Sequence, residues 1–292
     1  MALSGNFLQQ ISQTSLPHLQ SLFAPLAGIT TDFSTDIASA GQSVTTRFAV
    51  RPSVVDIVAD GYVPEPGSTT AKTITLSQHR GVTLGFTDID VLQSSINFER
   101  LFLSPMLQVL GADMFGQLWN LVTSGNFPSS ITSTAANFDR SDLIDLGQTL
   151  TSSAKAPKAS RAFLCNTDFY GALLKTLNTA EIPGITPDKA EGIVPRVSGM
   201  NVYETDLADD NSAYLGGFAM HSSALLMAAR RVNPEAALQD SIDIAEVVVP
   251  GLGLPITFRR YYDRALGQTC INVSCIWGVA VGTAMGVRVV TQ

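Results

Sequence analysis

The feature that most constrains this chain is a pair of strand-like segments within residues 43–84. Phe48 and Val50 alternate with Arg and Ala in the first segment, and Ile74 and Leu76 alternate with Thr and Ser in the second. Alternation with a period of two is typical of strands that are buried on one face. The sequence therefore predicts two long strands that run out and back.

The connection between these strands, residues 60–70, has the sequence DGYVPEPGSTT. It is too polar to form a core and too long for a tight hairpin turn. A two-stranded arm standing alone is only marginally stable in water. We therefore expect another subunit to cover this arm, so the sequence predicts assembly more clearly than chemistry.

The composition agrees with a chain that hides much of its surface. Of the 292 residues, 45% are hydrophobic and 15% are charged, whereas about 25% is typical for the charged fraction. A membrane protein would need an uncharged apolar run of about 18 residues. The nearest approach, residues 270–287, contains Asn272, Ser274 and several glycines, which favour strand. Subunit contacts therefore explain the mean hydropathy of +0.21 better than a membrane does.

The net charge and the cysteines argue against several other classes of protein. A net charge of −7 makes a general affinity for nucleic acid or anionic lipid unfavourable. The odd count of three cysteines, without CxxC spacing, argues against a disulfide framework or a zinc site. We expect three buried, reduced thiols. The N-terminus lacks a basic segment followed by an apolar core, so we expect no secretory signal and synthesis in a reducing cytosol.

Helix and strand signals follow one another in an α+β order. The first 42 residues show no sustained period and predict an extended arm. Ser104 and Pro105 form a helix start signal, and residues 124–126 a stop signal. Further helices are predicted from Asp139 to about Ser153, from Asn166 or Thr167, and from Ser222 to Arg231. Strands are predicted at 161–165, 200–205, 215–221, 242–249, 256–262, 269–281 and 287–291, with residues 263–267 as a hairpin turn.

This order resembles that of the major capsid proteins of tailed phages with the Hong Kong 97-type fold. The resemblance covers nearly the whole chain and rests on several short sequence segments. They are TITL and RGVTL within 73–84, GGFAMHSSALLMAARR at 216–231, ITFRRYYD at 256–263, WGVA at 277–280 and VRVV at 287–290.

The resemblance implies a division of the chain into domains. It places an N-terminal arm at 1–42, an extended loop at 43–82, a peripheral domain at 83–138 and 242–292 with a spine helix at about 99–124, and an axial domain at 139–241. A fused scaffolding domain would have to precede the arm, and none is expected.

The function implied by the resemblance is structural. Hexameric and pentameric capsomers of this chain would assemble into the icosahedral shell around a double-stranded DNA genome, without enzymatic activity, cofactor or metal. The partners would be a separate scaffolding protein, a portal protein, DNA held without sequence-specific contacts, and no membrane, with a decoration protein left open. The location would be the virion capsid, after assembly in the host cytoplasm. An encapsulin-type bacterial compartment shell is the alternative, and a hydrolase with an unrecognised site is the remote one.

Six arginines are candidates for cross-subunit ion pairs, because Arg suits interface pairing and Lys is depleted at interfaces. They are Arg47, Arg51, Arg230, Arg231, Arg259 and Arg260, with partners left open among Glu65, Glu99, Glu204 and Asp263. The candidate intersubunit contacts are Tyr62, Glu65, Arg47, Arg51, Arg259 and Arg260.

Other reactive side chains have structural explanations. His18, His79 and His221 are far apart and lack metal-binding spacing, and we expect His221 to be a structural hydrogen-bonding residue. The acidic turn 206–211 lacks the glycine and terminal Glu of a calcium loop. We expect Asp88 and Asp90 to pair with a neighbouring subunit's Arg.

Some relatives join their subunits by isopeptide bonds between a loop Lys and an Asn of a neighbour. The tip, 61–70, has no Lys, and the nearest is Lys72. Asn272 is available as a partner, but the missing tip Lys predicts a shell held by noncovalent contacts. The glycine-rich 251–255 precedes a predicted strand rather than a helix, so it is no dinucleotide loop.

Overall fold

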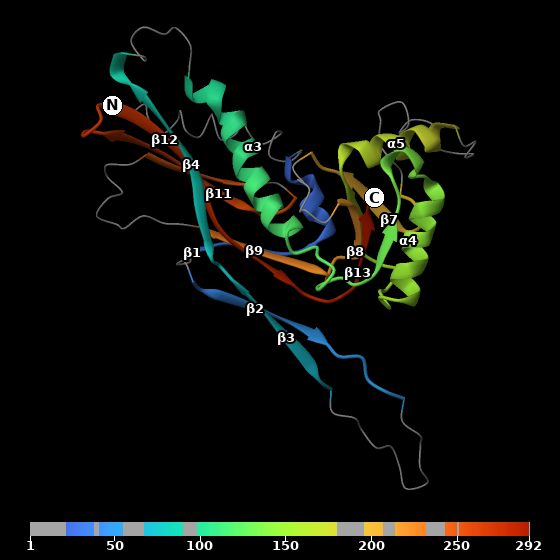
Figure 1. Cartoon of the computed structure of the whole chain (residues 1–292). Coiled ribbons are helices and arrows are strands. Elements are labelled where there is room, and N and C mark those ends of the chain that lie inside the picture. Colours follow the sequence, from blue (N-terminus) through green and yellow to red (C-terminus); the bar gives the residue numbers. More distant parts are fainter. Residues whose placement is uncertain are drawn as a thin grey trace.

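The computed structural model describes residues 22–37, 41–54, 67–89, 98–179, 196–206, 214–231, 243–249 and 251–291. All structural statements below concern these residues. They form a mixed α+β structure with a six-stranded sheet, a five-stranded sheet and a two-stranded arm, which confirms the predicted class (Figure 1).

The bounds of the elements are as follows. The strands are β1 (Thr30–Ile37), β2 (Ser43–Ala49), β3 (Thr69–Thr75), β4 (Gln78–Thr87), β5 (Ser130–Thr132), β6 (Arg161–Cys165), β7 (Met200–Glu204), β8 (Leu215–His221), β9 (Leu225–Arg231), β10 (Asp243–Val248), β11 (Pro255–Asp263), β12 (Gln268–Val281) and β13 (Gly286–Val290). The helices are α3 (Phe98–Trp119), α4 (Arg140–Ser152) and α5 (Thr167–Thr179), with short 3₁₀ turns η1 (Ala24–Gly28) and η2 (Ala135–Asn137).

The long strand β12 organises the six-stranded sheet, whose order is β1-β9-β12-β11-β10. β4 and β11 both pair antiparallel with its first half, from Gln268 onward, and therefore lie on its two edges. β9 pairs with its second half, Ile276–Val281. Side chains of β12 alternate between the two faces: Ile271, Val273 and Cys275 join the main core with α3.

Helix α3 covers one face of this sheet (Figure 1). It begins six residues before the predicted signal, so Pro105 lies inside the helix. A proline there removes one backbone hydrogen bond. Packing offsets this loss, because Leu103 is buried and the Phe102 ring lies 5.7 Å from the Phe86 ring of β4.

The end of α3 also differs from the prediction, since the helix stops at Trp119. The next residues form tighter turns, with the Val122 amide donating to the Trp119 carbonyl. The Asn126 side-chain amide donates to the Leu121 carbonyl at 2.8 Å. Val122 and Phe127 are both fully buried. Burying both side chains requires the chain to turn before the glycine signal at 124–126.

The five-stranded sheet has the order β5-β13-β8-β6-β7 and lies beside α4 and α5 (Figure 1). The predicted start of α4 is confirmed: the Asp139 carboxylate accepts the Asp142 amide, and the Asp142 carboxylate accepts the Asp139 amide. Asn166 caps α5 by accepting the Phe169 amide at 3.1 Å. These helices bury Leu143, Leu146 and other apolar residues against the sheet.

The helix predicted at 222–231 is wrong, because residues 225–231 form strand β9. Ala and Leu favour helix when considered alone. Here the run is buried on both faces: Leu225, Met227 and Ala229 face the main core, whereas Leu226 and Ala228 face the root of the arm. A continuous apolar run is typical of a strand covered on both sides.

The described part of the predicted N-terminal arm packs into the body. Phe23 and Leu26 are buried in the main core, and the Phe23 ring lies 6.5 Å from that of Phe115. β1 pairs parallel with β9 and extends the six-stranded sheet. Residues 22–37 are therefore an integral layer of the fold. The sheets also cross the predicted domain limits, since β9 joins the six-stranded sheet and β13 joins the five-stranded one. The division into domains stays a prediction.

Candidate assembly surfaces

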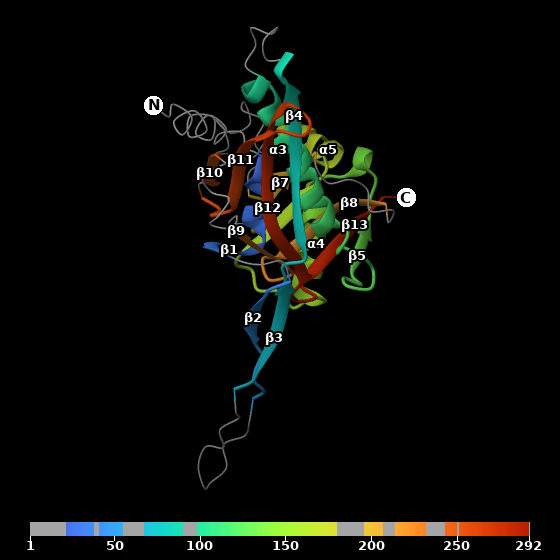
Figure 2. The same cartoon turned by 90° about the vertical axis from the view of Figure 1, so that its left-hand side faces the viewer.

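The two-stranded arm is the surface that the sequence singled out. β2 pairs antiparallel with β3 from Ser43 opposite Thr75 to Ala49 opposite Thr69. Figures 1 and 2 show this pair extending away from both sheets. The predicted out-and-back strands are therefore confirmed, while Tyr62 and Glu65 lie outside the described residues.

The root of the arm is packed onto the body. Ile74 and Leu76 are 1% exposed and contact Leu226, Ala228 and Ile276 of the six-stranded sheet. The approach is close enough to require glycine on β12. A Cβ at Gly278 would lie 2.1 Å from the carbonyl oxygen of Thr75. The arm thus leaves the body from a fixed base.

Beyond the root, the arm is uncovered. One face carries Thr45, Arg47 and Thr73, all exposed. Val50 is 46% exposed, and Arg51 is exposed as well. The described arm residues, 43–54 and 67–77, include three basic side chains and no acidic one. An acidic surface on another molecule would be complementary in charge to this part of the arm.

The other arginine candidates lie on the body and do not join Arg47 and Arg51 within the subunit. Arg259 and Arg260 are neighbours on β11 and therefore point to opposite faces. Both are half-buried, and burial lowers the pKa of the Arg259 guanidinium.

Arg230 and Arg231 have partners within the chain, and their role as cross-subunit partners stays a prediction. Arg230 meets the Asp32 carboxylate at 3.2 Å, and Arg231 pairs with Glu246. Asp32 lies on β1, which pairs with β9, whereas Glu246 lies on β10, which pairs with β11. Strand pairing, rather than proximity in the sequence, brings these acids to the arginines. Asp263, one of the open partners, accepts the amides of Ala265 and Leu266 in its own turn.

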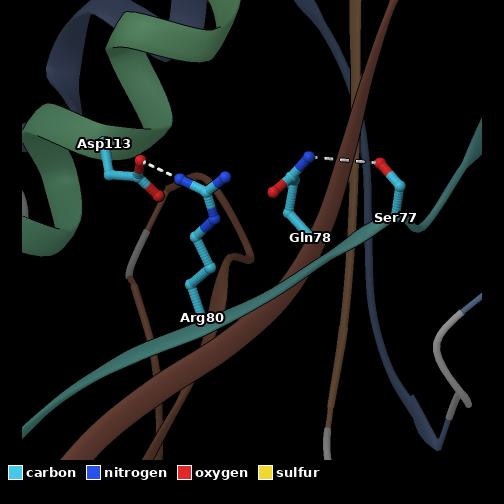
Figure 3. Close-up of polar contacts among 4 residues, drawn as sticks. All are labelled: Ser77, Gln78, Arg80 and Asp113. Atoms are coloured by element: carbon cyan, nitrogen blue, oxygen red, sulfur yellow. Dashed lines mark hydrogen bonds and ion pairs between the residues drawn. The ribbon is translucent and has the colours of Figure 1, made fainter.

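A further ion pair connects the sheet to the helix that covers it. Arg80 of β4 points to Asp113 of α3 at 2.5 Å, near a 3.4 Å contact from Gln78 to Ser77 (Figure 3). Local sequence gives no signal for this pair, because its residues are 33 positions apart.

His221 is a hydrogen-bonding residue, as predicted, although it joins two strands instead of a strand and a helix. Its Nδ1 accepts the Ser223 amide at 3.2 Å and contacts the Ser223 hydroxyl at 2.8 Å. That hydroxyl meets Thr283 at 2.9 Å. Burial, and then the positive charge of Arg161, lower the pKa of His221.

The structure tests some of the predictions for the remaining reactive side chains and leaves others untested. Asp88 accepts the Tyr262 hydroxyl at 2.7 Å, and its pairing with a neighbour stays a prediction. All three cysteines are buried, as expected, and burial raises the pKa of Cys275 to about 12. His18, Asp90 and residues 207–211 lie outside the described residues. Within the part of the chain that the structure describes, no group of three or more His, Cys, Asp or Glu could hold a metal ion.

The charged side chain of Arg161 is buried in the described structure. Arg161 is 2% exposed and donates to the carbonyls of Gly147, Ala156 and Pro157 and to the Thr151 hydroxyl. It thereby joins α4, through Gly147 and Thr151, to the loop that follows the helix, through Ala156 and Pro157. Its position within a run of strand residues gave no signal of this role.

Among the described helices, none is long and apolar enough to cross a membrane.

Known proteins show a likeness in structure but not in sequence. No protein-family model matches the chain, and no curated protein matches it either. The capsid structure of cyanophage P-SCSP1u has a TM-score of 0.60 at 11% identity, covering 92% of this chain and 88% of that one. The mature capsid of bacteriophage PhiM1 gives 0.55 at 10% identity, with 90% and 86% covered.

A virus-like particle from Pyrococcus furiosus gives a TM-score of 0.55 at 14% identity and covers 99% of this chain and 100% of that one. Each of the three likenesses spans at least 90% of this chain. The chain therefore has the fold of these phage capsid structures, and the resemblance seen in the sequence is confirmed at the level of the fold.

Proposed function

We propose that this chain is the major capsid subunit of a tailed phage, a structural protein rather than an enzyme. The observation that supports this most is a capsid-type fold with a two-stranded arm projecting from it. A projecting pair of strands with exposed Val50 and Arg47 gains little within its own subunit. Such an arm becomes stable when a neighbour covers it.

In the proposed shell, each part of the fold makes one kind of contact. The arm lies over an adjacent subunit, residues 139–241 act as an axial domain at the capsomer centre, and the sheet around β12 joins neighbouring capsomers as a peripheral domain. Helix α3 takes the part of the spine helix. Obligate contacts of this type bury roughly 2,000–5,000 Å².

The exposed apolar side chains support extensive contacts. Ile89, Leu101, Val109, Tyr214 and Leu266 are each more than half exposed in the isolated subunit. They come from the segment after β4, from α3, from the segment before β8 and from the turn between β11 and β12. Several neighbours, rather than one partner, would be needed to cover them.

The proposed partners follow from this role. The chain would form hexameric and pentameric capsomers, assemble with a separate scaffolding protein and a portal protein in the host cytoplasm, and enclose DNA without sequence-specific contacts. The net charge of −7 fits weak contact with DNA.

The alternative is the shell of an encapsulin-type compartment. The Pyrococcus furiosus particle, which is described as virus-like and not as a phage capsid, keeps this alternative open, because the likeness covers 99% of this chain and 100% of that one. The two candidates differ in what the shell encloses.

Electron microscopy of the purified protein, expressed with and without its neighbouring genes, tests the proposal. Closed icosahedral particles that contain genome-length double-stranded DNA would support the phage capsid. Particles that contain a protein cargo and no genome would favour the compartment. A monodisperse monomer under all conditions, including added scaffold and crowding agent, would refute both.

A further inference from the structure

A hollow of about 420 Å³ opens between helix α3, the turn η1 and the end of strand β7. Its lining includes the apolar side chains of Leu22, Pro25 and Leu107 and the carboxylates of Glu204 and Asp206. None of its lining residues is basic. The hollow therefore combines negative charge with apolar surface.

The negative charge of this hollow is not neutralised by the described part of the subunit. Glu204 and Asp206 are exposed, and neither forms an ion pair with another described residue. Burial, and then the negative charge of Glu204, raise the pKa of the Cys165 thiol. Asp168, which follows Thr167 of the lining, adds a third exposed carboxylate. A cation from outside the subunit would be attracted to this position.

The two-stranded arm carries the opposite charge. Arg47 and Arg51 are exposed, and neither forms an ion pair within the described ranges of the chain. The Val50 amide donates to the Ser68 carbonyl at 2.9 Å, so the pairing of the arm continues up to Arg51. In Figures 1 and 2 the arm points away from α3 and β7, so it does not reach the hollow of its own subunit. These opposite charges can meet only between two copies of the chain.

The structure also distinguishes among the acids that the sequence leaves open as partners of these arginines. Asp263 accepts two amides of its own turn. Glu65 and the side chain of Glu99 lie outside the described residues. Glu204 is exposed and has a second carboxylate, that of Asp206, in the same hollow. Glu204 is therefore the acid that is best placed to accept a cation from another subunit.

The lining suits the shape of an arginine side chain. Arginine has an apolar stem, which packs on apolar surface, and a charged end, which stays among polar groups. Leu22, Pro25 and Leu107 offer the apolar surface beside the two carboxylates. A guanidinium can bind a carboxylate through two parallel hydrogen bonds, which fixes its position as well as its charge.

We propose that in the assembled shell the basic arm of a second copy docks on this hollow, so that Arg47 and Arg51 pair with Glu204 and Asp206. The inference rests on the proposed function and deepens it, because it names the surface that the arm covers. Charge pairs across an interface fix the register of the two partners and speed their association. The hollow therefore determines where along its neighbour the arm lies.

The first experiment maps the contact in assembled shells. Arg47→Lys keeps the positive charge and supplies a primary amine, which a carbodiimide joins to a carboxylate in contact with it. Shells are assembled from equal amounts of ¹⁵N-labelled and unlabelled variant, treated with carbodiimide and digested for mass spectrometry. We expect peptides that join position 47 to Glu204 or Asp206, with one labelled and one unlabelled half. Links from position 47 to other carboxylates, or to a different protein, would overturn the proposal.

An exchange of charges then tests the pairing itself. The arm variant carries Arg47→Glu and Arg51→Glu, and the hollow variant carries Glu204→Lys and Asp206→Lys. Each should raise the protein concentration needed for assembly about tenfold or more, because like charges then meet at the contact. The four changes together should bring this concentration back to within about threefold of the wild-type value. Sedimentation measures it, and a combined variant that assembles no better than the two separate variants would refute the pairing.

The matched control removes the effect of net charge. The hollow variant is combined with Arg140→Glu and Arg264→Glu, which change two exposed arginines outside both surfaces. This protein has the same net charge as the combined variant, and its assembly should stay impaired. If it is restored as well, net charge is the cause and the proposal is wrong.

The result for the wild-type protein separates this inference from the proposed function. If the wild-type protein forms no shells, the proposed function fails and the docking of the arm fails with it. If shells form but the exchange of charges does not restore assembly, the shell protein stands and only the docking surface is wrong.

Discussion

The close contact between β12 and the arm root allows a sharp prediction at Gly278. In Gly278→Ala, the new Cβ would lie 2.1 Å from the carbonyl oxygen of Thr75 and 3.2 Å from the Cα of Leu76. Both are backbone atoms of the arm root, and they cannot rotate away as the end of a side chain can. The arm root has to move, and its apolar contacts through Ile74 and Leu76 open.

The expected loss of stability can be taken from other proteins in which a core was overpacked. Insertion of one methyl group into a packed site typically costs about 1–3 kcal/mol. The main core under α3 lies on the opposite face of the six-stranded sheet from the arm root. The loss of stability should therefore be confined to the arm root. The Leu76 amide, which donates to the Gln42 carbonyl at 2.8 Å, should exchange with solvent about 5- to 150-fold faster.

Hydrogen exchange followed by mass spectrometry or NMR measures this directly. The control is Gly116→Ala in α3, where an added Cβ meets nothing within 4 Å. That variant should keep the exchange rate of Leu76 and gain about 0.5–1 kcal/mol of stability from helix propensity. An unchanged rate for Leu76 in Gly278→Ala would refute the claim that the arm is fixed at this contact.

Three further predictions concern assembly and pH. Deletion of residues 62–70 should leave a folded subunit by circular dichroism but weaken assembly in sedimentation; equally stable particles would contradict the arm's role. Mature particles boiled in detergent should give one gel band near 31 kDa, whereas a ladder of multimers that Lys72→Ala abolishes would show covalent joining. The pKa of His221 is lowered in the folded state, so the unfolded chain binds more protons below about pH 6.5 and stability falls as the pH falls through this range. His221→Gln should flatten this dependence in thermal unfolding, and an unchanged profile would exclude His221 as its source.

Much of the fold could be predicted from local patterns. Alternation marked the two strands of the arm, β2 and β3, because a period of two reports one buried face. The strand predicted at 269–281 matches β12 to within one residue. Asp139 marked the start of α4, because an N-cap acts within its own helix turn. The projecting arm was also predictable, since its polar tip has no place in a core.

Other features were decided by contacts between distant parts of the chain. The run at 225–231 has good helix formers and becomes a strand because the main core and the arm root cover its two faces. Pro105 lies inside α3 because the Phe102–Phe86 contact stabilises the turn before it. Neither neighbour is visible in a window of local sequence.

Some residues of the candidate assembly surfaces could also be predicted from the sequence, and others could not. The sequence by itself determined that Arg47 and Arg51 lie on an exposed strand pair, because alternation and turn composition are local. Only the tertiary structure decided that Arg230 and Arg231 are paired within the chain, and that Gly81 lies so close to Ser274 that a Cβ there would be 2.7 Å from the serine Cβ. The physical reason is that ion pairing, cavity shape and burial depend on which strands become neighbours, and β4, β9, β11 and β12 meet across separations that local periodicity does not record.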